Sequence, residues 1–267
     1  MPSRAPLTRE TQLSKKLSWL LRHGAEKEGL ELNAAGYASV SAVLANQKIR
    51  SQKMTFAELQ AIVKDNDKQR FALSLREGCE DETSADPKDW MIRANQGHSV
   101  KVESEGLLEA IGEDDEVVKG NGVVVHGTTH AAWTRIVETG GLKVMGRNHV
   151  HFASGLPATF KPIDSADGPP ADQAGAPVIS GMRVSSTVLL YLNVEKAMAA
   201  GIKFWRSSNG VILTEGNTDG MVPMAFFKRV EDRTGEGLLV EDGKVVKEAP
   251  AGWATGGGKG KGRGGRG

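Results

Sequence analysis

The sequence predicts an α+β protein made of two lobes. Its 267 residues suffice for two ordinary domains, and an apolar content of 39% supports a packed core in each. Segments with helical periodicity come first and are followed by two alternating segments before residue 96. After residue 120 come several short strands with interspersed helices, an order typical of α+β folds.

The first lobe, residues 11–99, is predicted to begin with three helices. Residues 11–22 present one apolar helical face. The helix is predicted to end near Gly24, because glycine is common directly after the last residue of a helix. The residues of this face are Leu13, Leu17, Leu20 and Leu21. Ser39 is the predicted N-cap of a second helix, and Thr55 with Glu58 forms a capping box that opens a third.

Two alternating segments, 70–75 and 90–95, predict strands joined by an acidic, exposed loop at 77–89. Three helices followed by a hairpin is the order of a winged helix, so this fold is predicted for the first lobe. Up to Arg76, basic residues outnumber acidic ones by thirteen to seven, which is compatible with nucleic-acid binding and equally with an ordinary solvated surface.

The second lobe is predicted to span residues 100–232. Its expected strands are 123–126, 149–153, 186–192 and 211–214, and its expected helices are 131–139 and 195–201. A last apolar stretch, 224–230, is expected to end the globular part. Residues 155–177, rich in Pro, Gly, Ala and Asp, are predicted to be a flexible insertion. Residues 1–10 and the Gly/Lys/Arg-rich tail, 233–267, are predicted to be flexible.

One stretch of the second lobe carries the residues that predict a binding site. The apolar run Val123–Val125 leads into His126, Gly127 and Thr128, and Arg147 precedes His149 and His151. Alternation places these last two histidines on one face of a strand. A glycine directly after a buried strand allows close approach to the backbone, and polar residues at strand ends supply the polar groups of pockets.

A metal site is the alternative for the same histidines. His126, His149 and His151 could be three zinc ligands, as in zinc hydrolases. The neighbouring Arg147 favours an anion over a cation, so no metal is predicted. The single cysteine, Cys79, excludes a disulfide within the chain and a cysteine-based zinc site.

Composition gives further expectations about partners and compartment. No run of eighteen apolar residues and no apolar signal core occur, so the sequence predicts no membrane association and an intracellular protein, in cytoplasm or nucleus. A monomer is expected. Residues 256–267 carry four basic residues and no acidic one, so the net charge of +1 leaves about −3 for the remainder.

Several segments occur together in the order and wording of one known family. They are Leu20–His23, Ile92–Ser99, His126–Thr128, Arg147–Phe152, Gly181–Arg183, Phe204–Thr214 and Gly216–Gly220. From about Thr11 to Val230 the sequence resembles the RNA 2′-phosphotransferases, also called tRNA 2′-phosphotransferases. The departures are the insertion, the acidic loop and the tail, which lie outside these segments.

The resemblance implies a winged-helix first lobe and an ADP-ribosyltransferase-like second lobe that binds NAD⁺ as co-substrate. The family removes the internal splice-junction 2′-phosphate of ligated tRNA. It transfers this phosphate to NAD⁺ through a 2′-phospho-ADP-ribosylated RNA intermediate. The products are RNA with a 2′-hydroxyl, nicotinamide and ADP-ribose 1″,2″-cyclic phosphate. The implied partners are therefore 2′-phosphorylated tRNA or RNA and NAD.

The resemblance also implies roles for individual residues. The family's essential set corresponds to Arg22, His23, Arg93 and Arg147, which become the expected catalytic residues. His126 is expected to hold the adenosine ribose, and the backbone of Gly127 the nicotinamide amide. The full set of expected cofactor-binding residues is His126, Gly127, Thr128, His151, Asn209 and Gly210.

The chemistry suits these residue types. A 2′-phosphate beside a phosphodiester concentrates negative charge, which guanidinium groups bind bidentately. For Arg22 and His23, local sequence alone also allows a plain role, since both complement the dipole at a helix C-terminus. His23 is the hypothetical proton donor to the departing RNA 2′ oxygen. Two alternatives remain open: an ADP-ribosyltransferase acting on nucleic-acid terminal phosphates or on protein, and a non-catalytic winged-helix RNA-binding protein.

Overall fold

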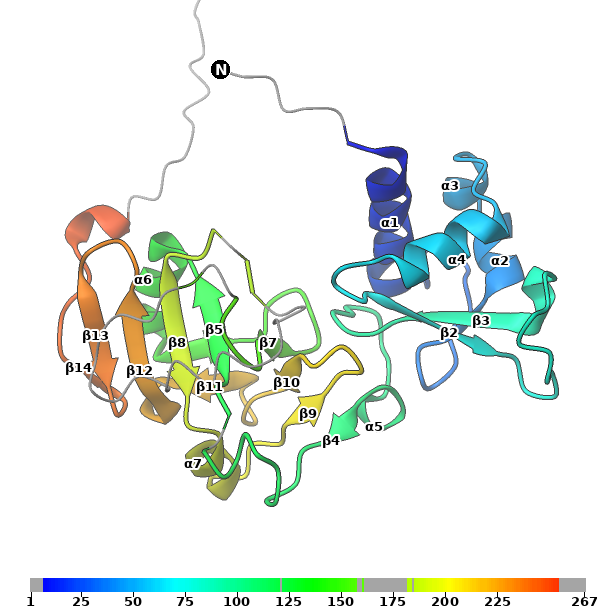
Figure 1. The fold of residues 1–267 in the computed structure, drawn as a ribbon. Helices are drawn as coiled ribbons and strands as arrows, with labels where there is room; N and C mark the ends of the chain where they lie inside the picture. The colour runs from blue at the N-terminus through cyan, green and yellow to red at the C-terminus, as the bar shows by residue number, and fades with distance from the viewer. Residues whose placement is uncertain (1–6, 121, 158–159, 161–181, 184, 255–267) are drawn as a thin grey trace, which may run out of the picture.

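The computed structural model describes residues 7–120, 122–157, 160, 182–183 and 185–254. It contains helices and antiparallel sheets in two lobes, which lie side by side in Figure 1. The α+β class is therefore confirmed. Within the described residues, no helix is long and apolar enough to cross a membrane.

The first helix, α1 (Arg9–Trp19), starts earlier than its leucine spacing indicated. Thr8 caps it by accepting a hydrogen bond from the Thr11 amide, and Arg9 forms an ion pair of 2.7 Å with Glu58. The prediction of a flexible N-terminus is therefore wrong for residues 8–10, and residues 1–6 lie outside the described part. The helix continues as a π-helical turn, η1 (Leu20–Gly24).

The remaining helices of the first lobe are α2 (Val40–Ala45), α3 (Gln47–Arg50) and α4 (Phe56–Lys64). The capping box before α4 is present: Thr55 accepts from the Glu58 amide, and the Glu58 carboxylate accepts from the Thr55 amide. Ser39 occupies the N-cap position of α2, but its hydroxyl bonds Ser41 instead of a helix amide.

A three-stranded antiparallel sheet completes this lobe. Its strands are β1 (Ala38–Ser39), β2 (Phe71–Leu75) and β3 (Trp90–Ala94), in the order β1-β3-β2. The loop between β2 and β3 contains the short turn η2 (Pro87–Asp89). Helices followed by a hairpin is the arrangement on which the winged-helix prediction rests. The leucines of α1 and η1 pack against α4 and β3 in one core.

The linker between the lobes, residues 95–110, contains α5 (Ser104–Leu107) and ends in β4 (Glu109–Ala110). The helices that follow are α6 (His130–Thr139), α7 (Val194–Ala199) and the short turns η4 (Met224–Phe226) and η5 (Ala251–Trp253). Gly140 ends α6 with a left-handed conformation, φ 75°, that glycine adopts without steric cost.

Among its described residues, the second lobe contains three antiparallel sheets. A four-stranded sheet has the order β4-β9-β10-β7, with β7 (Val150–Phe152), β9 (Trp205–Arg206) and β10 (Ile212–Thr214). A pair joins β6 (Gly141–Lys143) to β11 (Met221–Pro223). A five-stranded sheet has the order β14-β13-β12-β8-β5. Its strands are β5 (Val125–Thr128), β8 (Val188–Leu192), β12 (Phe227–Asp232), β13 (Gly237–Glu241) and β14 (Lys244–Val245).

The alternation of β8 shows how the lobe is layered. Leu190 faces the main core, where it joins Phe152 of β7, Ile212 of β10 and Trp133 of α6. Leu189 faces the other side and joins a smaller cluster with Met182 and Phe160. Both faces of β8 are therefore covered, which is why the strand reads as a continuous apolar run.

The globular part extends beyond the predicted boundary at residue 232. Strands β13 and β14 add to the five-stranded sheet, and Leu239 and Val240 are buried in the main core. The sequence expectation of a flexible tail from residue 233 is therefore wrong up to Trp253. Isolated Gly and charged residues around 233–237 hid a short hairpin, whose apolar residues Leu239 and Val240 belong to the main core of the lobe.

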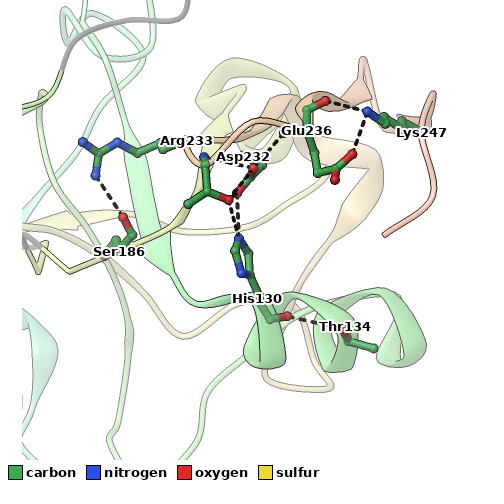
Figure 2. A network of polar contacts seen from close by, with 8 residues as sticks. His130, Thr134, Ser186, Asp232, Arg233, Glu236 and Lys247 are labelled. Atoms are coloured by element: carbon green, nitrogen blue, oxygen red, sulfur yellow. Dashed lines mark hydrogen bonds and ion pairs between the residues drawn. The ribbon is translucent and has the colours of Figure 1, made fainter. Parts of the chain in front are cut away.

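Polar contacts attach this C-terminal hairpin to α6 (Figure 2). Asp232 is fully buried and accepts hydrogen bonds from the amides of Thr234 and Glu236 and from His130 Nε2 at 2.7 Å. Burial raises the pKa of Asp232, but these hydrogen bonds lower it by more. Trp253 then stacks on the ring of His130 with centroids 3.8 Å apart.

Most of the predicted insertion, residues 155–177, lies outside the described residues. At its described part, Phe160 is buried and the guanidinium carbon of Arg233 lies 3.4 Å from its ring centroid. Arg233 also donates to the Ser186 carbonyl (Figure 2).

Candidate active site

Arg22 lies in the π-helical turn that follows α1. Its Nε and Nη2 atoms are buried and have no hydrogen-bond partner among the described residues. Burial, followed by the charges of Arg147 and Arg70, lowers the pKa of Arg22 to about 10. Gly97 lies beneath this side chain, because a Cβ atom there would be 3.6 Å from Arg22 Nε. The turn therefore holds a guanidinium group whose buried Nε and Nη2 donate to no acceptor among the described residues.

His23 follows in the same turn and faces the linker. Its Nδ1 lies 2.9 Å from Ser99 Oγ, a hydrogen bond whose donor depends on the tautomer. Burial and then the charges of Arg147 and Arg22 lower the pKa of His23. The Arg22 carbonyl accepts from the amides of Ser99 and Val100, so the linker is attached directly to this turn.

Arg93 reaches the site from the central strand of the first-lobe sheet. Its guanidinium carbon lies 4.8 Å from the ring centroid of Tyr37, and Nη1 donates to the Ala35 carbonyl at 3.3 Å. Its Nε is buried and unpartnered among the described residues. The loop that carries Tyr37 therefore orients a second guanidinium group that still has free donors.

Arg147 comes from the second lobe, in the loop between β6 and β7. It is exposed, and burial of its inner atoms and then the charge of Arg183 lower its pKa. The next residue, Asn148, attaches this loop to the linker: its amide donates to the His98 carbonyl and its Nδ2 to the Val100 carbonyl, both at 2.9 Å. Because the linker also binds the Arg22 turn, Arg147 is held near Arg22 and His23.

His98 is the residue at this junction that sequence reasoning did not select. Its side chain is 2% exposed, and Nε2 has no partner within the described part of the chain. Burial, followed in order by the charges of Arg22, His149, His23 and Arg93, lowers its pKa to about 3. The sequence signal that could have selected His98 was its position. It follows the predicted strand 90–95, lies where the two predicted lobes join, and belongs to the segment Ile92–Ser99.

His126 lies in β5, with Gly127 and Thr128 following in the same strand. Its Nδ1 is 2.8 Å from the His151 carbonyl, and a carbonyl only accepts, so the neutral ring carries its proton on Nδ1. Burial is the main cause of a lowered pKa. His126 Nε2 is then an acceptor. Gly127 leaves room for the side chain of Met182, because a Cβ atom at Gly127 would lie 2.4 Å from it.

His151 repeats this arrangement one strand away. Its Nδ1 donates to the His149 carbonyl at 2.9 Å, and its Nε2 is buried without a partner among the residues described. Burial and then the charge of Arg147 lower its pKa to about 3, so the ring is neutral and Nε2 is an acceptor. His126 and His151 thus present two acceptor nitrogens from neighbouring strands, β5 and β7.

His149 makes polar contacts on the side of Ser104 and Glu215. Its Nε2 lies 2.9 Å from Ser104 Oγ, and that hydroxyl donates to Glu215 at 2.9 Å, so in this arrangement His149 Nε2 donates to Ser104. No group of three or more His, Cys, Asp or Glu side chains with metal-binding geometry occurs in the described residues.

Asn209 and Gly210 lie at a contact between the lobes. Asn209 Nδ2 donates to the Lys68 carbonyl of the first lobe at 2.9 Å, and Oδ1 accepts from Ser207. Gly210 has a φ of 77° in the turn before β10. The side-chain bonds of Asn209 therefore join the lobes, and its expected role toward a cofactor stays a prediction.

A cleft of about 490 Å³ opens beside Arg22 and His23 in the first lobe. One wall is a polar face of α1, and the other is the segment 65–70 that connects α4 to β2. We call it the α1 cleft. Arg93, Arg147 and the histidines of the second lobe do not line it.

Comparisons with known proteins match most of the chain. The model of the family "RNA 2′-phosphotransferase, Tpt1 / KptA family" matches residues 8–216. The tRNA 2′-phosphotransferase 1 of Danio rerio is 39% identical over 226 residues, which are 84% of this chain and 86% of that protein. The protein of the same name in Bos taurus is 41% identical over 82% of this chain and 74% of its own length. The tRNA 2′-phosphotransferase of Saccharomyces cerevisiae is 33% identical over 83% of this chain and 84% of its own.

Proposed function

The chain belongs to the RNA 2′-phosphotransferase, Tpt1 / KptA family, and from this we propose that it is an NAD-dependent tRNA 2′-phosphotransferase. It transfers the internal splice-junction 2′-phosphate of ligated tRNA to NAD⁺. The products are RNA with a 2′-hydroxyl, nicotinamide and ADP-ribose 1″,2″-cyclic phosphate.

The observation that carries this proposal is the buried, unpartnered guanidinium of Arg22 at the junction of the lobes. Buried polar groups are normally hydrogen-bonded, and a buried charge without a counterion is costly. Burial and then the positive charges of Arg147 and Arg70 lower the pKa of Arg22, so these two charges repel its guanidinium group. A phosphate dianion bound among Arg22, Arg93 and Arg147 would satisfy their donors and remove this repulsion.

The first step forms a bond between a 2′-phosphate oxygen and C1″ of NAD⁺, while the bond from C1″ to nicotinamide breaks. The phosphate is already an anionic nucleophile and needs no strong base. The arginines orient it, and alignment supplies most of the acceleration. The intermediate is RNA carrying a 2′-phospho-ADP-ribose group.

In the second step the ribose 2″-hydroxyl attacks phosphorus and loses its proton to solvent. The bond from phosphorus to the RNA 2′ oxygen breaks, and that oxygen takes up a proton. Charge on the equatorial phosphate oxygens is stabilised by the arginines. His23 is the proposed proton donor. Burial and then the neighbouring cations lower the pKa of His23 in the free protein. A bound phosphate dianion raises this pKa again, so that substrate binding loads the proton that this step consumes.

The second lobe is proposed to hold NAD⁺. The buried acceptor Nε2 of His151 and the acceptor Nε2 of His126 fit ribose hydroxyls or an amide N–H. Gly127 lets the chain at Met182 lie close against β5, and its backbone with that of Thr128 is the expected partner of the nicotinamide amide. An ADP-ribosyltransferase-like second lobe and a winged-helix first lobe remain part of this proposal.

Incubating the protein with a 2′-phosphorylated RNA, with and without NAD⁺, tests the function. Mass spectrometry should detect RNA with a 2′-hydroxyl and ADP-ribose cyclic phosphate only when NAD⁺ is present. Final products with ADP-ribose retained on the acceptor would favour an ADP-ribosyltransferase. RNA binding without any consumption of NAD⁺ would favour a non-catalytic RNA-binding protein.

A further inference from the structure

The α1 cleft continues from the site proposed for the 2′-phosphate. Arg22 and His23 line one end of it. A nucleotide covalently linked to a phosphate that these residues bind therefore lies next to the cleft. From Arg22 the cleft follows α1 back to Thr11 and Glu10. At 1.5 Å per residue, the distance along the helix from Arg22 to Glu10 is about 18 Å.

Charge is distributed unequally along this cleft. Arg70 and Lys68 line it together with Arg22, and the charge of Arg70 contributes to the lowered pKa of Arg22, so these cations lie near one another. Lys15 lines the cleft from α1. Among the described residues, neither Lys15 nor Lys68 has an ion-pair partner. Asp67 is the one acidic residue adjoining Lys68 in this wall.

The far end of the cleft is acidic. Glu10 and Asp65 line it there, and both also line a smaller neighbouring cleft around the Arg9–Glu58 ion pair. A phosphate is repelled from this end. Carboxylates do accept hydrogen bonds from the amino groups of bases. The charges thus allow one phosphodiester near Arg22 and Lys68 and a base beyond it, but no second phosphate.

The walls also suit a nucleoside in size and in polarity. Between the charged residues, the α1 wall consists of the small hydroxyl side chains Thr11, Ser14 and Ser18. Trp19 lines the same cleft beside Arg22 and His23, at the end opposite Glu10. The opposite wall is fixed from the second lobe, because Asn209 binds the Lys68 carbonyl.

We propose that the α1 cleft holds the nucleotide adjacent to the 2′-phosphorylated one in a single-stranded RNA. Its phosphodiester lies against Lys15, Lys68 and Arg70, and its base points toward Asp65 and Glu10. This inference rests on the proposed function and adds the site for the RNA strand.

The test measures RNA binding without NAD⁺, so that its result does not depend on turnover. The probes are one RNA that consists of the 2′-phosphorylated nucleotide alone and others extended by one or more nucleotides on either side. In the parent protein, one added nucleotide on one side should tighten binding, and further nucleotides on that side should add little. Lys15→Ala and Lys68→Ala should each abolish that gain and lower the log–log salt slope by about one.

Lys16→Ala is the matched control, because Lys16 is the next residue of α1 and does not line the cleft. It should keep the parent's gain and salt slope. If the added nucleotide tightens binding equally in Lys15→Ala, Lys68→Ala and the parent, the cleft does not hold RNA. The proposed function is judged separately, since absence of NAD⁺-dependent turnover in the parent refutes it whatever the binding result.

Discussion

The basic residues of the site lie close together, and neighbouring groups do not offset the electrostatic repulsion between them. Burial is the main cause of the lowered pKa values of these groups. Beyond burial, the charge of Arg147 lowers the pKa of Arg22, His23 and His151, and the charge of Arg183 lowers the pKa of Arg147 and His126. Among the described residues, no carboxylate offsets this repulsion at these groups. Sites that favour a charged ligand are commonly destabilised in this way before the ligand binds.

Arg93→Ala should abolish removal of the 2′-phosphate while the protein stays folded. We expect kcat/KM to fall on the order of a hundredfold or more, since Arg93 supplies donors that stabilise transition-state charge. Activity assays combined with thermal unfolding measure both effects. Arg76→Ala is the control, because Arg76 follows β2 on the same hairpin and is exposed. Full activity of Arg93→Ala would remove Arg93 from the anion site.

His23→Ala should separate the two chemical steps. Arg22, Arg93 and Arg147 remain to bind the phosphate and support the first step, whereas the RNA 2′ oxygen loses its proton donor. RNA bearing a 2′-phospho-ADP-ribose group should therefore accumulate, and mass spectrometry detects the added mass. If both substrates stay intact, His23 acts before or during the loss of nicotinamide and the assigned role is wrong.

At the scale of elements, the π-helical turn η1 places Arg22 and His23. A π turn widens the helix locally, and such turns are frequent at functional sites. Gly24 makes the turn possible here, because a Cβ atom at this position would lie 2.5 Å from the Trp19 ring. Leucines of α1 fix the helix in the core, and the turn then directs its last residues to the linker.

Gly24→Ala should therefore disturb the site without touching a charged residue. The added methyl group must displace Trp19 or the turn, at a cost of about 1–3 kcal/mol in the free energy of unfolding. Urea unfolding and kcat/KM should both show a decrease. Gly112→Ala is the control, since no atom lies within 4 Å of a Cβ there and its φ is not in the left-handed region. Parent-like activity and stability of Gly24→Ala would show that the turn tolerates a side chain.

The C-terminal hairpin is a structural element of the second lobe. A chain ending at residue 232 loses β13, which pairs with β12, and loses the Thr234 and Glu236 amides that satisfy Asp232. We expect this truncation to yield little soluble, folded protein, because a buried carboxylate and an apolar sheet face are uncovered. A chain ending at residue 254 should unfold at the temperature of the full chain. Equal thermal unfolding of both truncations would contradict this role.

At the scale of the whole molecule, the site exists because the linker joins the lobes. The linker binds the Arg22 carbonyl on one side and Asn148 on the other, and His98 is buried where these contacts meet. Burial, and then the charges of Arg22, His149, His23 and Arg93, favour the neutral imidazole of His98. The joint between the lobes should therefore respond to acid.

Lowering the pH should destabilise the protein through His98. Its folded-state pKa of about 3 lies below the ordinary value of 6.5, so between these values the unfolded chain binds more protons. Stability is complete above about pH 6.5 and decreases as the pH falls, by up to about 1.4 kcal/mol per pH unit for this one group. Urea unfolding between pH 7 and 5 should show a shallower decrease for His98→Gln than for the parent. Identical slopes would show that His98 is not buried as a neutral ring.

The sequence by itself determined the features that depend on neighbouring residues. Leucine spacing predicted α1, the pair Thr55 and Glu58 predicted the start of α4, and alternation predicted β2 and β3. Short-range periodicity and capping are local properties, so no partner is needed to recognise them. The order of the motifs also indicated the family, including the four basic residues proposed for catalysis.

Only the tertiary structure decided which of these residues meet. Arg22 and Arg147 are far apart in sequence, and the hydrogen bonds of the linker bring them together. Those contacts bury His98, and they leave Asn209 bound to Lys68 at the lobe contact. The hairpin strand β13 pairs with its sequence neighbour β12, but β12 in turn pairs with β8, a strand distant in sequence. Burial and strand pairing depend on partners distant in sequence, and a local pattern contains no information about where such partners lie.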